Sequence, residues 1–233
     1  QKAKPEQWCG LECIPAVDNN DEVHAALRTG RIMLAAGTAW LWSREQMAAS
    51  VDLLFIDEAG QFSLANALAV APAANTLVLV GDPQQLEQPI QGSHPPGVHV
   101  SALEHLLGGA ATVDADRGLF LGETWRLHPT ICDYTSELFY DSRLHPREGL
   151  ARQEVRSAGS LSGSGLRFIG VEHQGNQNTS HEEVDVVAKL VGDLVNGRST
   201  WIDREGRVHA VGEEDILIVA PYNAHVAAIS ARV

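Results

Sequence analysis

The stretch Val51-Asp-Leu-Leu-Phe-Ile-Asp-Glu-Ala-Gly-Gln61 decides the fold expected for this chain. Four consecutive apolar residues, Leu53 to Ile56, are followed directly by the carboxylates of Asp57 and Glu58. An uninterrupted apolar run predicts a strand buried on both faces, as in a parallel sheet covered by helices. Ligands of such sheets bind beyond the carboxyl ends of the strands. The stretch therefore indicates either a site built on two carboxylates or a strand that simply ends in a solvated acidic turn.

Adjacent carboxylates at a strand end can divide the work of phosphoryl transfer. The first, Asp57, would hold Mg²⁺ directly or through water, and the second, Glu58, would orient and activate the attacking water. A second apolar strand, at 76–80, ends in Gly81-Asp82-Pro83-Gln84-Gln85. The spacing between the two strands is that of a strand–helix–strand unit, so both strand ends would face one crevice. An amide such as that of Gln85 can bond to a γ-phosphate or to the attacking water there.

The rest of the chain repeats the alternation of helices with apolar strands, which predicts an α/β fold with parallel sheets. A region rich in Arg, Gly and Ser at 143–165 predicts a linker. Further strands are predicted at 31–36, 118–122, 166–171 and 215–220. Helices are predicted at 20–28, 43–49, 62–70, 101–107 and 181–196, from Pro129 onward and after Asn223.

Length and composition fit an ordinary globular protein of one large or two small domains, with 233 residues. No apolar run approaches the roughly 18 residues of a membrane span, and no signal peptide opens the chain. The three cysteines are too few for a disulfide framework, and no Cys or His pair at ligand spacing accompanies Cys9 and Cys13. Free thiols suit a reducing compartment, so a cytoplasmic protein is expected.

The charge distribution argues against a uniformly basic surface for nucleic acid. The formal net charge is −13, and residues 1–116 hold 5 Lys and Arg against 14 Asp and Glu. Residues 117–233 are more balanced, with 12 against 16. Any track for a phosphate backbone must therefore be local or lie in sequence outside this chain.

Four motifs in order and spacing resemble motifs II, III and IV and the post-strand segment of superfamily 1 helicases. They are IDEAGQ at 56–61, VGDPQQL at 80–86, TWRLHP at 124–129 and ILIVAPYNAHV at 216–226. The branch they resemble is that of 5′→3′ enzymes related to the nonsense-mediated-decay helicase. The longer stretches LFIDEAGQFSLANALAVAPAA and GDPQQLEQPIQGSHPPG look like the helicase part of bacterial proteins that carry a RecB-like nuclease region. The resemblance covers nearly the whole chain.

The resemblance implies two RecA-like domains with ATP between them and single-stranded DNA or RNA across both. Residues 1–124 would be part of the first domain and residues 125–233 part of the second. In the ATP site, Asp57 resembles the Mg²⁺ residue, Glu58 the catalytic base and Gln85 the γ-phosphate sensor.

In the second domain, Trp125 stands where the family usually has a nucleotide-contacting Tyr, and Arg126 matches a phosphate-contacting Arg. The indole keeps an aromatic face but lacks the hydroxyl group of Tyr. Glu183 resembles a nucleotide-contacting Glu, yet Ser180-His-Glu-Glu183 is also a capping-box sequence that needs no ligand.

Three positions match segments that follow nucleic acid in the family: Thr38, Pro221 and Tyr222. Each has an alternative structural explanation, namely a turn, a strand terminus and a packed aromatic ring. Asn223 has one too, because it is placed to cap the last helix.

The chain departs from the family in lacking Gly-Lys-Ser/Thr, the loop that cradles phosphates. Its lysines are Lys2, Lys4 and Lys189, and none follows a glycine. Motifs V and VI are also missing. The sequence therefore predicts a fragment of an ATP-dependent helicase that is inactive by itself. Two other functions stay open: an interaction module that needs no nucleotide, and an ATPase switch that binds nucleic acid without unwinding it.

Overall fold

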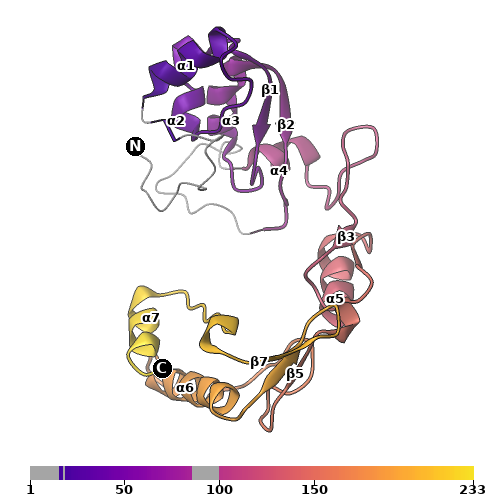
Figure 1. Cartoon of the computed structure of the whole chain (residues 1–233), viewed down its shortest axis with the longest axis vertical. Helices are drawn as coiled ribbons and strands as arrows, with labels where there is room; N and C mark the ends of the chain where they lie inside the picture. Colours follow the sequence, from indigo (N-terminus) through magenta and orange to yellow (C-terminus); the bar gives the residue numbers. More distant parts are fainter. Residues whose placement is uncertain (1–15, 18, 86–99) are drawn as a thin grey trace. The chain divides into compact units, whose positions relative to one another are not determined.

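The computed structural model describes residues 16–17, 19–85 and 100–233, and the structural statements below concern these residues. Cys9 and Cys13 lie outside them. The chain divides into two compact units, Gln1–Val113 and Asp114–Val233, and each is described by itself (Figure 1).

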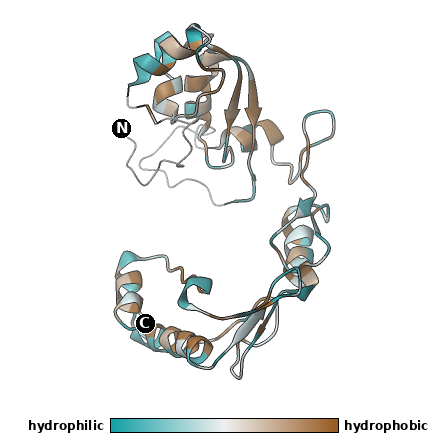
Figure 2. Cartoon of the chain, in the orientation of Figure 1, coloured by the Kyte–Doolittle hydropathy of each residue, from teal (hydrophilic) through white to brown (hydrophobic). Residues whose placement is uncertain are grey.

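The first unit is built on two parallel strands, β1 (Val51–Ile56) and β2 (Ala74–Leu79), paired from Val51 with Ala74 to Ile56 with Leu79. Helix α3 (Leu64–Val70) and a 3₁₀ turn, η3 (Ala71–Ala73), connect them. This is the strand–helix–strand arrangement predicted from the sequence, and Figure 2 shows both strands in apolar colours. The other elements are α1 (Asn20–Arg28), α2 (Ala39–Trp42), η2 (Glu45–Met47) and α4 (Ala102–Leu107).

One face of this sheet carries the core of the first unit. Leu54 and Ile56 of β1 are buried against side chains of α2, η2 and α3, including those of Met47 and Val70. The prediction that β1 is buried on both faces is wrong, because Leu53 and Phe55 on its other face are 53% and 61% exposed among the described residues. The apolar run does form the strand, but only alternate side chains reach the core, as the period of two of a strand requires.

The second unit combines helices with short strands. β3 (Glu123–Thr124) pairs in parallel with β4 (His145–Pro146), and α5 (Pro129–Phe139) lies between them in sequence. An antiparallel sheet has the order β5 (Glu154–Arg156), β6 (Thr200–Ile202), β7 (Val208–Ala210). Two more helices are α6 (His181–Val195) and α7 (Asn223–Ser230), and short 3₁₀ turns are η4 (Leu150–Arg152) and η5 (Glu213–Asp215).

The four other predicted strands, at 31–36, 118–122, 166–171 and 215–220, do not form in the part of the chain that the structure describes. A strand needs a partner for its backbone N–H and C=O groups, and an apolar composition does not supply one. Large side chains of three of these segments also stay outside a core: Met33, Phe168 and Leu217 are 94%, 97% and 88% exposed.

The prediction of a linker at 143–165 is also wrong. That segment contains β4, η4 and β5, and the side chain of Leu150 within it is fully buried. Its Gly and Arg residues serve turns and polar contacts, so a polar composition does not mark a linker here. The sequence also gave no sign of the β6–β7 hairpin.

Candidate functional site

The ends of β1 and β2 lie next to each other and their following loops are packed tightly. The parallel pairing continues past the strands, since Val80 N–H donates to Ile56 O and Ala59 N–H donates to Val80 O, both at 2.9 Å. A Cβ atom on Gly81 would lie only 2.6 Å from the backbone nitrogen of Ala59. Glycine is therefore required at 81 for the two loops to approach this closely.

Gly60 has the same role from the other loop. A Cβ atom there would collide with the backbone carbonyl oxygen of Asp82. Gln61 Nε2 donates to Gln85 Oε1 at 3.3 Å, so the side chains of the two loops are linked as well. The loop of Asp82 is further held by its own carboxylate, which accepts from Gln84 N–H at 3.0 Å. The structure thus brings the predicted Gln85 to the same edge of the sheet as the residues that follow β1.

Asp57 and Glu58 are both exposed at that edge. Asp57 Oδ1 accepts a hydrogen bond from Glu58 N–H at 3.0 Å. Glu58 has a φ of +53°, a left-handed conformation that a non-glycine residue adopts at a cost of about 1–3 kcal/mol. Strain of this kind persists where the surrounding structure imposes it, and it often accompanies a functional site. The two carboxylates are held in a turn and remain open to a ligand.

The carboxylates at this edge can hold Mg²⁺ only together with other ligands, such as waters and phosphate oxygens. Within the described ranges no group of three or more His, Cys, Asp and Glu could hold a metal ion. Mg²⁺, however, usually takes only one or two carboxylates and completes its shell with waters and phosphate oxygens. Asp57, exposed beside the loop of Asp82, offers such a sparse donor set.

The Thr124–Pro129 motif forms a turn that leads into α5. Thr124 Oγ1 accepts from the backbone N–H groups of Arg126 and Leu127, at 3.3 and 3.4 Å. His128 Nδ1 accepts from Thr130 N–H at 3.3 Å and so caps the helix, with Pro129 in its first turn. His128 thus has a structural role. Arg126 is exposed, and no described residue forms a hydrogen bond or ion pair with its guanidinium group.

Trp125, the residue before it, has two arginines near its ring. The Trp125 side chain is half-exposed, and the guanidinium carbon of Arg147 lies 3.4 Å from the ring centroid. The guanidinium carbon of Arg204 lies 5.6 Å from the same centroid. The sequence indicated neither contact, because Arg147 lies in the segment read as a linker and Arg204 in the unpredicted hairpin.

The carboxylate of Glu183 contacts two histidines of the second unit. Its carboxylate oxygens lie 3.6 Å from His173 Nε2 and 3.6 Å from His225 Nε2. Ser180 Oγ accepts from Glu183 N–H at 3.2 Å, as a helix cap should. The reciprocal bond of a capping box is absent among the described residues, because Ser180 N–H donates to His225 Nδ1 at 3.2 Å instead. The capping-box interpretation is therefore half right.

The residues proposed to follow nucleic acid lie in different units. Thr38 is exposed at the N-terminus of α2 in the first unit. Pro221 and Tyr222 are exposed before α7 in the second unit, and Tyr222 rather than Asn223 occupies the N-cap position of that helix. Among the described residues no side chain caps α7, so the alternative interpretation of Asn223 as a cap is wrong.

Cys132 is a core residue of α5. It is completely buried, and its Sγ lies 3.6 Å from the carbonyl oxygen of Leu144. Burial raises the pKa of its thiol, and the carboxylate of Asp133 raises it further. A buried thiol with a raised pKa is a poor nucleophile, so this cysteine is structural.

Comparison with known proteins places the chain in a family. The family model described as "AAA domain" matches residues 99–233, more than half of the chain. The chain therefore belongs to the AAA domain family. This membership agrees with the mixed α/β structure and its parallel strand pairs, as a RecA-like fold requires.

The similar proteins include named helicases. The chain is 25% identical over 195 residues to the DNA polymerase alpha-associated DNA helicase A of Schizosaccharomyces pombe, covering 80% of this chain and 28% of that protein. It is 25% identical over 151 residues to the helicase sen1 of the same organism, covering 61% and 9%. It is 27% identical over 202 residues to the human 3′-5′ exoribonuclease HELZ2, covering 76% and 6%. The chain thus spans less than a third of each relative, and the resemblance to superfamily 1 helicases is supported.

Among the described residues, no helix is both long and apolar enough to cross a membrane.

Proposed function

We propose that this chain belongs to an ATP-dependent nucleic-acid helicase or translocase that couples ATP hydrolysis to movement on single-stranded DNA or RNA. The observation that carries the proposal is the tight packing of the loops after β1 and β2 through Gly60 and Gly81. It puts the side chains of Asp57, Glu58 and Gln85 at one sheet edge, where α/β folds bind ligands.

In this proposal each residue at the edge has one task. Asp57 takes Mg²⁺, which neutralises charge on the phosphates when bound. Glu58 accepts the proton of the attacking water, and the amide of Gln85 contacts the γ-phosphate. The bond from Gln61 occupies the carbonyl oxygen Oε1 of the Gln85 amide and would leave its NH₂ group to donate to a phosphate oxygen.

The second unit would supply the rest of the nucleotide contacts. Arg126 has a guanidinium group that no described residue engages, and this group can meet phosphate oxygens in bidentate fashion. Trp125 and Glu183 would contact the nucleotide, and Thr38, Pro221 and Tyr222 the nucleic-acid strand. For Glu183 this contact would replace its present contacts with His173 and His225. The two parts would be residues 1–124 of one RecA-like domain and 125–233 of a second.

These 233 residues contain no Gly-Lys-Ser/Thr loop. Because positioning and charge stabilisation are nearly the whole of catalysis in phosphoryl transfer, we expect the chain by itself not to hydrolyse ATP. We also propose a cytoplasmic location and, from the motif resemblance, a RecB-like nuclease region as a fused or associated partner.

The test is Glu58→Gln in a longer protein that joins this chain to a phosphate-binding loop. Loss of a general base should lower ATP turnover by about 10²–10⁴-fold while ATP binding persists. Glu45→Gln is the matched control, since Glu45 is an exposed glutamate of the same unit at η2. Phosphate release is measured with and without single-stranded DNA or RNA, and ATP binding by calorimetry.

Equal turnover in the Glu58→Gln and Glu45→Gln proteins would overturn the assignment of the base. No ATP binding in the unmodified protein would favour the nucleotide-independent interaction module. Hydrolysis that single strands stimulate, but without strand displacement, would favour the ATPase switch.

A further inference from the structure

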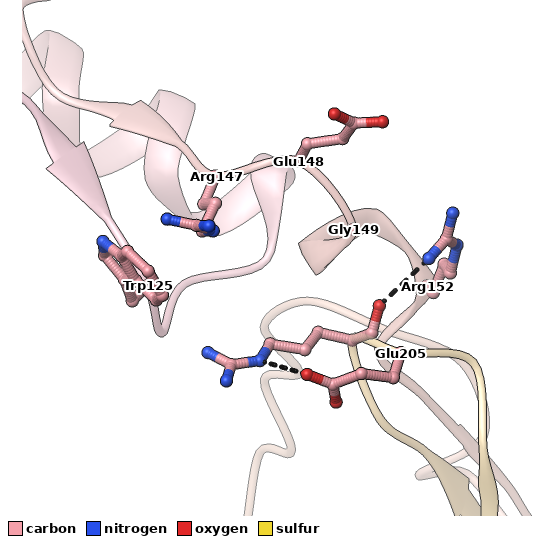
Figure 3. Close-up of a pocket in the computed structure, with 7 residues that line it drawn as sticks. Trp125, Arg147, Glu148, Gly149, Arg152 and Glu205 are labelled. Carbon is pink, nitrogen blue, oxygen red and sulfur yellow. Dashed lines mark hydrogen bonds and ion pairs between the residues drawn. The ribbon is translucent and has the colours of Figure 1, made fainter.

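A pocket of about 310 Å³ lies within the second unit, around the exposed ring of Trp125 (Figure 3). The β3–α5 turn contributes the indole ring, the loop after β4 contributes Arg147, and the β6–β7 turn contributes Arg204. Its volume is at the lower end of the range for small-molecule sites. The full set of lining residues is Trp125, Arg147, Glu148, Gly149, Arg152, Arg204 and Glu205.

The β6–β7 turn that presents Arg204 is fixed by Asp203. The Asp203 carboxylate accepts from Arg207 N–H and Arg207 Nε at 2.8 Å each, and it lies 2.9 Å from His209 Nε2. Burial raises the pKa of this carboxyl group, but the hydrogen bonds from His209 and Arg207 outweigh burial and hold the pKa well below its usual range. Trp201 stacks on the His209 ring with centroids 4.4 Å apart. The hairpin is therefore a preorganised support rather than a loose loop.

The turn is also fastened to the loop after β4. Arg152 Nη1 donates to the carbonyl oxygen of Arg204 at 3.2 Å. Gly149 has a φ of +92°, and a Cβ atom there would lie 2.8 Å from the same oxygen. Both contacts use the backbone of Arg204, so its side chain, which pairs with Glu205, takes no part in the docking of the turn.

The pocket has more positive than negative charge, with three arginines against Glu148 and Glu205. Arg204 pairs with Glu205 at 2.8 Å, and Arg147 pairs with Glu123 at 3.3 Å. Arg152 contacts a carbonyl oxygen instead, so within the described chain no carboxylate pairs with its charge. An unpaired guanidinium beside an open cavity favours an anion, and the Arg147 guanidinium that stacks on the Trp125 ring lines the same cavity.

We propose that this pocket binds the phosphate group of a nucleotide unit, through Arg147, Arg152 and Arg204 beside the indole ring of Trp125. A free nucleotide and a nucleotide within a single strand both present this chemistry. The class of ligand, a nucleotide, is taken from the proposed function, on which this inference rests. The inference adds the residues that would hold the phosphate. It requires no hydrolysis.

The experiment compares Arg204→Ala with Arg156→Ala in the full chain. Arg204→Ala keeps the backbone carbonyl, so the bond from Arg152 and the docking of the turn should persist. Arg156 is the matched control, because it too is an exposed arginine paired with a neighbouring glutamate, but it lies on β5 outside the pocket. The probes are ATP, a labelled single-stranded DNA and a labelled single-stranded RNA, measured by calorimetry and fluorescence anisotropy.

For Arg204→Ala we expect the Kd of at least one probe to rise about tenfold, the effect of losing one hydrogen bond to a charged group. If the source is a single strand, the slope of log K against log salt should also fall in magnitude by about 1. If the source is a free nucleotide, ATP binding should weaken and strand binding should not. Arg204→Lys keeps the positive charge but loses the forked guanidinium group. Its Kd should therefore lie between those of the unmodified chain and of Arg204→Ala.

Equal Kd values for Arg204→Ala and Arg156→Ala with all three probes would overturn the proposal, and circular dichroism verifies that both variants are folded. This outcome differs from a failure of the proposed function. A failed Glu58→Gln test would remove the motor and leave these binding constants unchanged.

Discussion

The first unit buries one apolar cluster against β1, whereas the second unit relies on separate, largely polar contacts. In the first, Leu54, Ile56 and Met47 belong to a single buried cluster. In the second, Ser180, Asp203 and His225 are buried and hydrogen-bonded, on different elements. Apolar burial is non-directional and tolerates imprecise placement, while buried polar groups destabilise a fold unless each finds its partner. The two units should therefore respond differently to mutation.

The largest effect is expected in the core of the first unit. Met47→Ala should lower the free energy of unfolding by about 2–5 kcal/mol, because Met47 is 1% exposed and its truncation leaves a cavity. Met33→Ala is the control within the same unit, since Met33 is 94% exposed. Urea unfolding followed by circular dichroism measures both. A similar small change in the two variants would show that this cluster does not hold the unit together.

A smaller and pH-dependent effect is expected from the hairpin of the second unit. The folded-state pKa of Asp203 lies below the unfolded value of about 4, so its contribution to stability is present above that pH. The contribution is lost as the pH falls through the folded-state pKa. Asp203→Asn should therefore be less stable than the unmodified chain at neutral pH, and the difference should shrink in acid.

Melting temperatures from neutral pH down to about pH 2 test this prediction. Asp193→Asn removes an exposed carboxylate of the same unit and should leave the profile almost unchanged. A melting-temperature difference between Asp203→Asn and the unmodified chain that does not vary with pH would contradict the role given to the ionised carboxylate.

The smallest effect is expected from the cap of α6. Ser180→Ala removes the acceptor for Glu183 N–H and should destabilise the second unit by about 1 kcal/mol. The loss stays modest because the backbone bond from Ser180 to His225 does not use the side chain. Ser160→Ala, in an exposed turn, is the control for chemical denaturation. A loss of stability as large as that from Met47→Ala would contradict this prediction, because it would exceed the contribution of a single helix cap.

Several elements were predictable because their signals are local. The apolar run at Leu53–Ile56 gives β1, Ser63 and Ser101 cap the predicted helices, and the period of α6 is visible in its sequence. The adjacency of the two strand ends was also predictable, because a strand–helix–strand connection leaves parallel neighbours.

The sequence by itself determined β1, β2 and most of the helices, the family resemblance and the candidate residues Asp57, Glu58, Gln85 and Arg126. Only the tertiary structure decided which apolar segments pair, since 215–220 is as apolar as β1 yet belongs to no strand. It alone brought Arg147 and Arg204 to Trp125, across 22 and 79 positions of sequence. Capping and periodicity act within a few residues, whereas strand pairing and pocket formation depend on partners far along the chain. No local pattern of residues specifies those partners.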